Sequence, residues 1–152
     1  MIRLKRTSTK DRDFRNLIVE LDTDLQSRYK DVKYQYNANT DVDHLNTAVI
    51  AYIQDIAVGC GCFKEIGENT VEIKRMFVNP YFRGFGVASS IIEELLIWAK
   101  QLYYAEAVLE TGKKQPESIK LYAKHGFTII DNFGPYVGME ESVCMRMHLT
   151  NK

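Results

Sequence analysis

One stretch of the chain decides how its fold is interpreted: VEIKRMFVNPYFRGFGVA, which spans residues 71–88. Its first half belongs to a strand-like segment over Thr70–Val78. Its second half holds Gly84 and Gly86 and opens the clearest helical pattern of the chain. A glycine-containing turn at the start of a helix presents backbone N–H groups and the positive end of the helix dipole. This stretch therefore predicts a site for an anion.

Two common phosphate-binding motifs do not fit this turn. The dinucleotide fingerprint needs a third glycine at a fixed spacing and an acidic residue in a βαβ unit, and the P-loop needs a Gly-Lys-Ser/Thr end. The sequence has neither at this turn, so the predicted anion site belongs to another class.

The apolar periodicity outside this stretch predicts an α+β, or mixed α/β, fold. Steps of two predict strands, and steps of three and four predict helices. The three strands between residues 47 and 78 follow one another across short turns, so an antiparallel meander is the simplest topology. Residues 31–46 fit either a loop or a broken second helix. The expected strands are Ile2–Arg6, Thr47–Ile53, Ile56–Glu65, Thr70–Val78, Glu106–Thr111, Phe127–Ile130 and Ser142–Leu149, and the expected helices cover residues 11–29, 86–102 and 116–124.

The length of 152 residues fits a single domain over residues 1–152. The 20 Lys and Arg side chains balance 20 Asp and Glu, which argues against a nucleic-acid-binding protein and against a polybasic membrane-surface protein. No basic-plus-apolar leader opens the chain, and no apolar run reaches the roughly 18 residues of a membrane span. We therefore expect a soluble, cytoplasmic protein.

Metal and disulfide chemistry find little support in the sequence. The three cysteines, Cys60, Cys62 and Cys144, are too few and too scattered for a disulfide framework or a four-ligand zinc site. Cys60 and Cys62 are two apart in an expected strand, so we expect both to be buried on one face. The three histidines are isolated, and His125 is expected to cap a helix end. We expect no metal.

Two motifs together carry a resemblance to a known family. Arg83-Gly84-Phe85-Gly86-Val87-Ala88 resembles the R/Q-x-x-G-x-G/A signature with which the GNAT superfamily of N-acetyltransferases binds the pyrophosphate of acetyl-CoA. Ser118–Phe127 resembles the second signature of that family, a helix that ends in Leu-Tyr and is followed by Gly-Phe. Both motifs lie in the expected order on the expected elements. One position departs from the pattern, since Gln115 stands where many relatives have an asparagine that contacts the pantetheine arm.

The resemblance implies a fold and a co-substrate. The implied fold is a twisted, mostly antiparallel sheet of six to seven strands flanked by about four helices, in which Thr70–Val78 and Glu106–Thr111 splay apart. The pantetheine arm of acetyl-CoA would lie in that opening, and the pyrophosphate would bind the turn. The implied cofactor-binding residues are Met76, Phe77, Val78, Arg83, Gly84, Phe85, Gly86, Val87, Ala88, Gln115 and Ser118.

Acetyl transfer to an amine requires a base, because a free alkylamine has a pKa near ~10.4 and must lose a proton before it attacks. Glu72 is the first candidate, since glutamate serves at this spacing in several branches of the family. Strict alternation would also place it on the same sheet face as Val78. Glu110 or water is the competing base, and Glu72 could instead bind a cationic substrate or pair with a neighbouring cation. Tyr122 of the second motif is the implied acid for the departing thiolate.

The sequence says least about the acceptor and its binding site. The resemblance implies that Tyr29 and Tyr136 bind the acceptor, and Glu110 could face it from the end of its strand. The leading hypothesis is a small molecule with a primary amine. A protein lysine or N-terminal acetyltransferase and a non-catalytic acyl-CoA sensor are the alternatives. A homodimer would also fit, since dimers are common in the family. Two basic stretches, residues 74–83 and 113–124, lead us to expect positive charge beside the phosphates of the cofactor.

Overall fold

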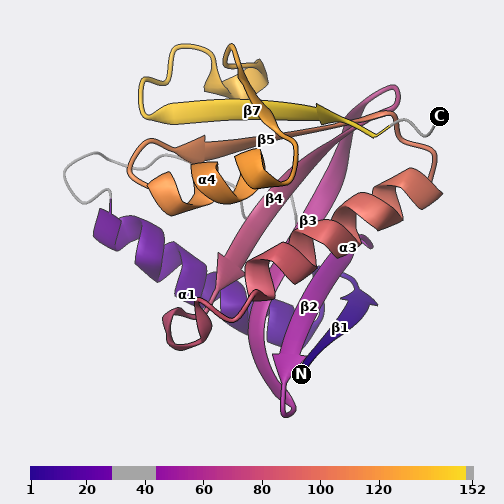
Figure 1. Cartoon of the computed structure of the whole chain (residues 1–152), viewed down its shortest axis with the longest axis vertical. Coiled ribbons are helices and arrows are strands. Elements are labelled where there is room, and N and C mark those ends of the chain that lie inside the picture. The colour runs from indigo at the N-terminus through magenta and orange to yellow at the C-terminus, as the bar shows by residue number, and fades with distance from the viewer. Residues whose placement is uncertain (29–43, 150–152) are drawn as a thin grey trace.

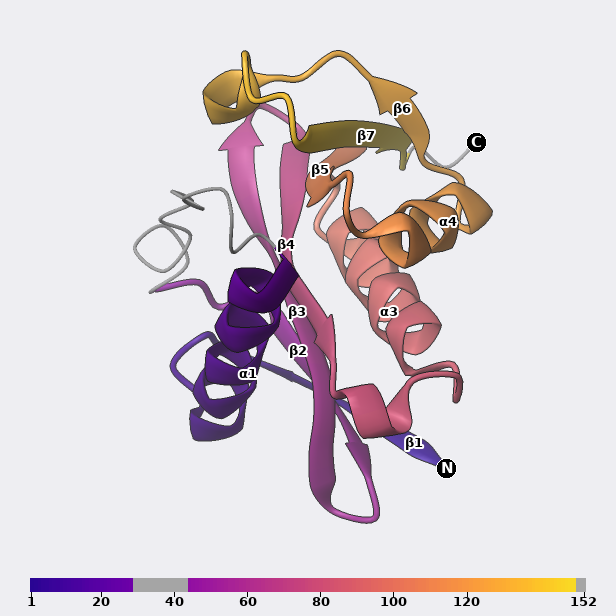
Figure 2. The ribbon, with the colours of Figure 1, turned by 90° about the vertical axis from the view of Figure 1, so that its left-hand side faces the viewer.

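The computed structural model describes residues 1–28 and 44–149 and shows a seven-stranded sheet with helices on both faces (Figures 1 and 2). The strand order is β1-β2-β3-β4-β5-β7-β6, which confirms the expected fold class. The described ranges contain three α-helices where about four were expected. The elements are β1 (Ile2–Thr7), α1 (Arg12–Arg28), β2 (Ala48–Ile53), β3 (Ile56–Gly67), β4 (Thr70–Val78), α3 (Val87–Gln101), β5 (Glu106–Gly112), α4 (Pro116–Lys124), β6 (Thr128–Ile130) and β7 (Ser142–His148), with short 3-10 turns η1 (Pro80–Phe82) and η2 (Gly134–Tyr136).

Strands β1 to β4 form the expected antiparallel meander. Strand β5 then pairs with β4 in parallel and with β7 in antiparallel orientation, and β6 closes the sheet at its far edge. Within the described ranges, no helix is both long and apolar enough to cross a membrane.

Helix α1 covers one face of the sheet. Its apolar residues recur at three- and four-residue steps, and Phe14, Leu17 and Leu21 are buried against that face. Cys60 and Cys62 lie in the same cluster and are fully buried, as predicted from their spacing.

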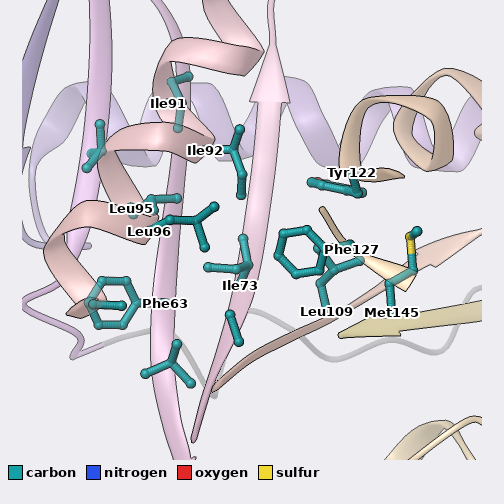
Figure 3. Packing of buried hydrophobic residues seen from close by; sticks show 14 of the residues in the cluster. Phe63, Ile73, Ile91, Ile92, Leu95, Leu96, Leu109, Tyr122, Phe127 and Met145 are labelled. Atoms are coloured by element: carbon teal, nitrogen blue, oxygen red, sulfur yellow. The ribbon is translucent and has the colours of Figure 1, made fainter. Parts of the chain in front are cut away.

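Helix α3 covers the opposite face. Ile91, Ile92 and Leu95 are fully buried and pack with Phe63 and Ile73 of the sheet (Figure 3). Burial of an aliphatic side chain of this size contributes about 1.5–3 kcal/mol. This packing holds α3 on the sheet, and the turn that precedes the helix is held with it.

A β-bulge interrupts the centre of β4. The register between β3 and β4 shifts between Cys60 and Cys62, so that two residues of β4, Arg75 and Met76, lie opposite Gly61 alone. Arg75 adopts a φ of 60°, a value that is uncommon for residues other than glycine. A bulge of this kind reverses the alternation of side chains along the rest of the strand.

The bulge changes which side chains share a face. Before it, Val71 and Ile73 join the α3 cluster, which leaves Glu72 on the α1 face. After it, Val78 joins the α3 cluster and Phe77 the α1 cluster. The expectation that Glu72 and Val78 share a face is therefore wrong, because it assumed an unbroken strand.

The expected separation of β4 from β5 is confirmed. The two strands pair only from Thr70 opposite Glu106 to Ile73 opposite Leu109. The second half of β4 keeps β3 as its neighbour, with Gly59 opposite Val78. The side of β4 that faces away from β3 is thus left open beyond Ile73.

Candidate active site

Two cavities meet at the opening between β4 and β5. The larger, of about 320 Å³, lies along the turn from β4 to α3, and we call it the loop cavity. The smaller, of about 60 Å³, lies beside Glu72 and Glu110, and we call it the carboxylate cavity. Five described residues line both cavities and form their common boundary: Leu21, Met76, Gln115, Ser118 and Tyr122.

The wall of the loop cavity at the turn is built from backbone. Gly84 and Gly86 have φ values of 90° and 82°, which glycine adopts without strain. A β-carbon at either glycine would meet no atom within 4 Å, so there is room for a ligand to approach the backbone. Gly86 is the N-cap of α3 and offers no side chain to the first turn of the helix. The N–H groups of that turn are therefore available to an anion.

Arg83 stands beside this turn and is tied to the end of β4. Its Nε donates to the carbonyl oxygen of Val78 over 3.1 Å, and its Nη2 lies 3.9 Å from Oδ2 of Asp24 on α1. The side chain is 39% exposed. Its guanidinium can therefore turn toward a bound phosphate.

The expected excess of positive charge at the loop cavity is only partly met. Lys74 and Arg75 are buried on the α1 face, beside Glu72 and Asp22. The lysines of residues 113–124 are exposed and line neither cavity. Two arginines and two carboxylates contribute the charge among the described lining residues: Arg28, Arg83, Asp24 and Glu117. The side-chain charges that line the loop cavity therefore balance one another.

Arg28 links α1 to α4 at the rim of the loop cavity. Its guanidinium lies 3.2 Å from Asp24, one turn earlier in α1, and 2.6 Å from Glu117 at the start of α4. It also donates to the carbonyl oxygen of Lys114 over 3.2 Å. Neither Arg28 nor Asp24 was predicted from the sequence as part of the site. Their i,i+4 spacing was a local signal for the pair, but nothing in the sequence predicts the contact with α4.

Glu72 lies at the carboxylate cavity with its side chain almost completely buried. The hydroxyl of Tyr136 donates to Oε2 of Glu72 over 2.6 Å, and Nζ of Lys74 lies 3.6 Å from the same oxygen. These two contacts compensate the carboxylate for its loss of water.

Glu110 lies on β5 at the same cavity. Oγ of Ser142 donates to its Oε2 over 2.7 Å. Burial raises the pKa of Glu110, the Ser142 hydrogen bond lowers it, the nearby charge of Glu72 raises it and that of Lys74 lowers it, with a net upward shift. The two carboxylates of this cavity thus have different partners: Glu72 contacts Tyr136 and Lys74, and Glu110 contacts Ser142.

Tyr122 lines both cavities. Figure 3 shows its side chain near Phe127. It is buried on α4 and its ring packs edge-on against Phe127, with 5.8 Å between centroids. Burial, followed by the charge of Glu110, raises the pKa of Tyr122 well above its ordinary value. The hydroxyl therefore keeps its proton at neutral pH and can act as a donor.

The structure brings most of the predicted site residues together. Of the expected cofactor residues, all except Phe85 line the loop cavity; Phe85 is 62% exposed and contacts Phe82. Gln115 accepts a hydrogen bond from the Gly112 N–H through its Oε1. His125 is the C-cap of α4, as predicted. No group of metal-binding side chains occurs within residues 1–28 and 44–149.

The expected substrate residues are placed differently from one another. Glu110 lines the carboxylate cavity. Tyr136 lines neither cavity, and at 1% exposure it lies behind Glu72. Tyr29 lies outside the described residues. Two residues that the sequence analysis did not propose, Leu21 and Leu25 of α1, form an apolar wall of the carboxylate cavity.

Comparison with known sequences identifies related proteins. The sequence model of the acetyltransferase (GNAT) family matches residues 12–127. An IAA acetyltransferase from Azospirillum brasilense is 36% identical over 89 residues, which cover 58% of each chain. An N-acetylaspartate synthetase from Danio rerio is 33% identical over 82 residues, which cover 53% of this chain and 29% of that protein. The matches thus span little more than half of the first relative's length and under a third of the second's.

Solved structures show the same fold over nearly the whole chain. A "putative acyl-CoA N-acyltransferase" from Klebsiella pneumoniae superposes with a TM-score of 0.82 at 27% identity and covers 99% of both chains. The PaiA N-acetyltransferase from Thermoplasma acidophilum, solved in complex with coenzyme A, has a TM-score of 0.71 at 15% identity and covers 97% of this chain and 99% of that one.

Proposed function

The chain belongs to the acetyltransferase (GNAT) family, and we propose that it transfers an acetyl group from acetyl-CoA to the primary amine of a small molecule. The observation that carries this proposal is the shared boundary of the two cavities. Tyr122 lines both the cavity along the turn that holds Gly84 and Gly86 and the cavity that holds Glu72 and Glu110, which supports a role for it at the reacting atoms.

The loop cavity fits acetyl-CoA as the co-substrate. The N–H groups of the turn and of the first turn of α3 would bind the pyrophosphate, and Arg83 would add a charged hydrogen bond. The open side of β4 offers the backbone of Met76, Phe77 and Val78 to the amides of the pantetheine arm, as an added strand would use it. Free space beside Gly84 and Gly86 supports this placement.

Three groups of the chain can divide the chemistry among them. Glu72 would take a proton from the acceptor amine, directly or through a water molecule, so that the neutral amine attacks the thioester carbon. Backbone N–H groups near Phe77 and Val78 would stabilise the oxyanion that forms. Tyr122 would give its proton to the thiolate as the carbon–sulfur bond breaks. Glu110 remains the alternative base.

The dimensions of the carboxylate cavity favour a small acceptor. Its volume is about 60 Å³, and Leu21 and Leu25 of α1 close one of its sides. The names of two relatives, an IAA acetyltransferase and an N-acetylaspartate synthetase, also support a small molecule.

A thiol-release assay tests this proposal. The protein is mixed with acetyl-CoA and a panel of amino acids, polyamines, aminoglycosides and lysine-containing peptides, and free CoA is measured. We expect release with at least one small primary amine and none above background with peptides. Release with peptides alone would indicate a protein acetyltransferase, and tight CoA binding without release under any condition would indicate a sensor.

A further inference from the structure

The contact between Glu72 and Tyr136 carries an inference about how the catalytic carboxylate is held. Tyr136 comes from η2 in the segment between β6 and β7, 64 residues further along the chain, yet its hydroxyl reaches Oε2 of Glu72. The distance of 2.6 Å is short, as expected for a hydrogen bond to an ionised acceptor. We propose that Tyr136 is a positioning residue that holds Glu72 in its proton-accepting orientation. This inference rests on the proposed function of Glu72 as the base.

The segment that carries Tyr136 is itself fixed. Nδ2 of Asn132 donates to the carbonyl oxygens of Tyr136 and Met139, each over 3.1 Å. The Tyr136 ring packs edge-on against Phe133 with 5.3 Å between centroids, and only 1% of the residue is exposed. A donor held by packing and by backbone clamps loses little entropy when it binds the carboxylate, which is what positioning requires.

Lys74 completes the arrangement from the other direction. Its Nζ lies 3.5 Å from the Tyr136 hydroxyl and 3.6 Å from Oε2 of Glu72. Both neighbours therefore act on Oε2, and no hydrogen bond within the described ranges engages Oε1.

The arrangement also explains why Tyr136 does not itself contact the substrate. It lines neither cavity, whereas Glu72 and Lys74 line the carboxylate cavity. Tyr136 thus acts on the reaction through the side chains it contacts, Glu72 first among them, which separates its role from that of Tyr122.

The charged and titratable groups around Glu72 define what a pH profile will report. Lys64 on β3 is paired directly with Glu72 in the strand register, the other groups come from the elements around it, and the profile belongs to this group as a whole. These other groups are Lys74 and Arg75 on β4, Asp22 on α1 paired with Arg75, Glu110 on β5, Tyr122 on α4 and Cys144 on β7.

The test compares Tyr136→Phe with a matched control. Tyr136→Phe keeps the buried ring and removes only the hydroxyl. Tyr52→Phe removes another buried hydroxyl, which donates to Oδ2 of Asp13 over the same 2.6 Å at the junction of β2 and α1, away from both cavities. Each variant is assayed for kcat/KM across pH with the acceptor found by thiol release, and its fold is checked by thermal melting.

We expect Tyr136→Phe to move the acid limb of kcat/KM to higher pH by about one unit. The loss of a donor destabilises the ionised carboxylate, and one unit corresponds to a tenfold change in proton affinity. The KM for acetyl-CoA should stay within about twofold, and Tyr52→Phe should keep the wild-type profile. Asn132→Ala, which loosens the clamp but keeps both partners, should give a smaller shift in the same direction.

A Glu72→Gln background separates the positioning role of Tyr136 from the base role of Glu72. If Glu72→Gln slows turnover but Tyr136→Phe leaves the pH profile unchanged, the positioning role is wrong and the base assignment stands. A Tyr136→Phe shift that persists in the Glu72→Gln background overturns the positioning role as well. If Glu72→Gln has wild-type turnover, the base assignment fails and takes the positioning role with it.

Discussion

A β-carbon at Gly61 would lie 2.5 Å from Sδ of Met76, across the bulge in β4. The same β-carbon would stand 3.0 Å from Cδ1 of Leu95 on α3. Because Gly61 has no side chain, the side chain of Met76 can occupy the space between Gly61 and α3 at the bulge. Because the bulge reverses the alternation of β4, this contact helps to set which face carries Phe77 and Val78 relative to Glu72.

Gly61→Ala should therefore destabilise the protein. Inserting a methyl group into a packed site typically costs about 1–3 kcal/mol. The matched control is Gly67→Ala at the end of β3, where a β-carbon would meet nothing within 4 Å. Urea denaturation of both variants measures the difference, and equal free energies of unfolding would show that Met76 and α3 accommodate the methyl group freely.

Arg83→Ala should weaken the binding of CoA. A hydrogen bond to a charged group contributes about 1.5–3 kcal/mol, so the Kd should rise roughly 10- to 100-fold. Lys120→Ala is the control, because Lys120 is exposed on α4 and lines neither cavity. Isothermal titration with CoA gives both constants, and an unchanged Kd for Arg83→Ala would remove this residue from the phosphate site.

The prediction for Arg83 could be made from the sequence alone, whereas the prediction for Gly61 needs the structure. The turn at residues 83–88 and the helix that carries Tyr122 are local motifs, so their chemistry can be assigned from neighbours within a few residues. Such motifs predicted eleven of the eighteen described residues that line the loop cavity. The meander was also predictable, since its strands are joined by short turns.

The missed features depend on contacts between distant segments. No glycine in β4 predicts the bulge at Arg75 and Met76. The glycine that permits it, Gly61, lies on the neighbouring strand β3. The contact of Arg28 with Glu117 joins two helices that are far apart in the sequence. Tyr136 was expected at the substrate because the family resemblance implied it, but its side chain is buried behind Glu72.

The raised pKa of Glu110 predicts how stability depends on pH. Its folded pKa lies above the ordinary value of 4.5, so between those two values the native state binds more protons than the unfolded state. The stability that the protonated form provides is complete below pH 4.5 and is lost as pH rises through the folded pKa. Glu110→Gln, which stays neutral, should therefore gain stability relative to wild type as pH increases above 4.5. Urea denaturation at a series of pH values checks this, and a difference that does not change with pH would contradict it.

The most direct test of the central claim compares wild type with Tyr122→Phe, because Tyr122 stands on the boundary of the two cavities. CoA release with the best acceptor and the Kd for CoA are measured on both proteins. We predict that Tyr122→Phe slows release by roughly 10²-fold, the usual scale for a general acid, while the Kd stays within a few-fold. Equal rates of release by the two proteins would contradict the claim that acetyl transfer takes place where the cavities meet.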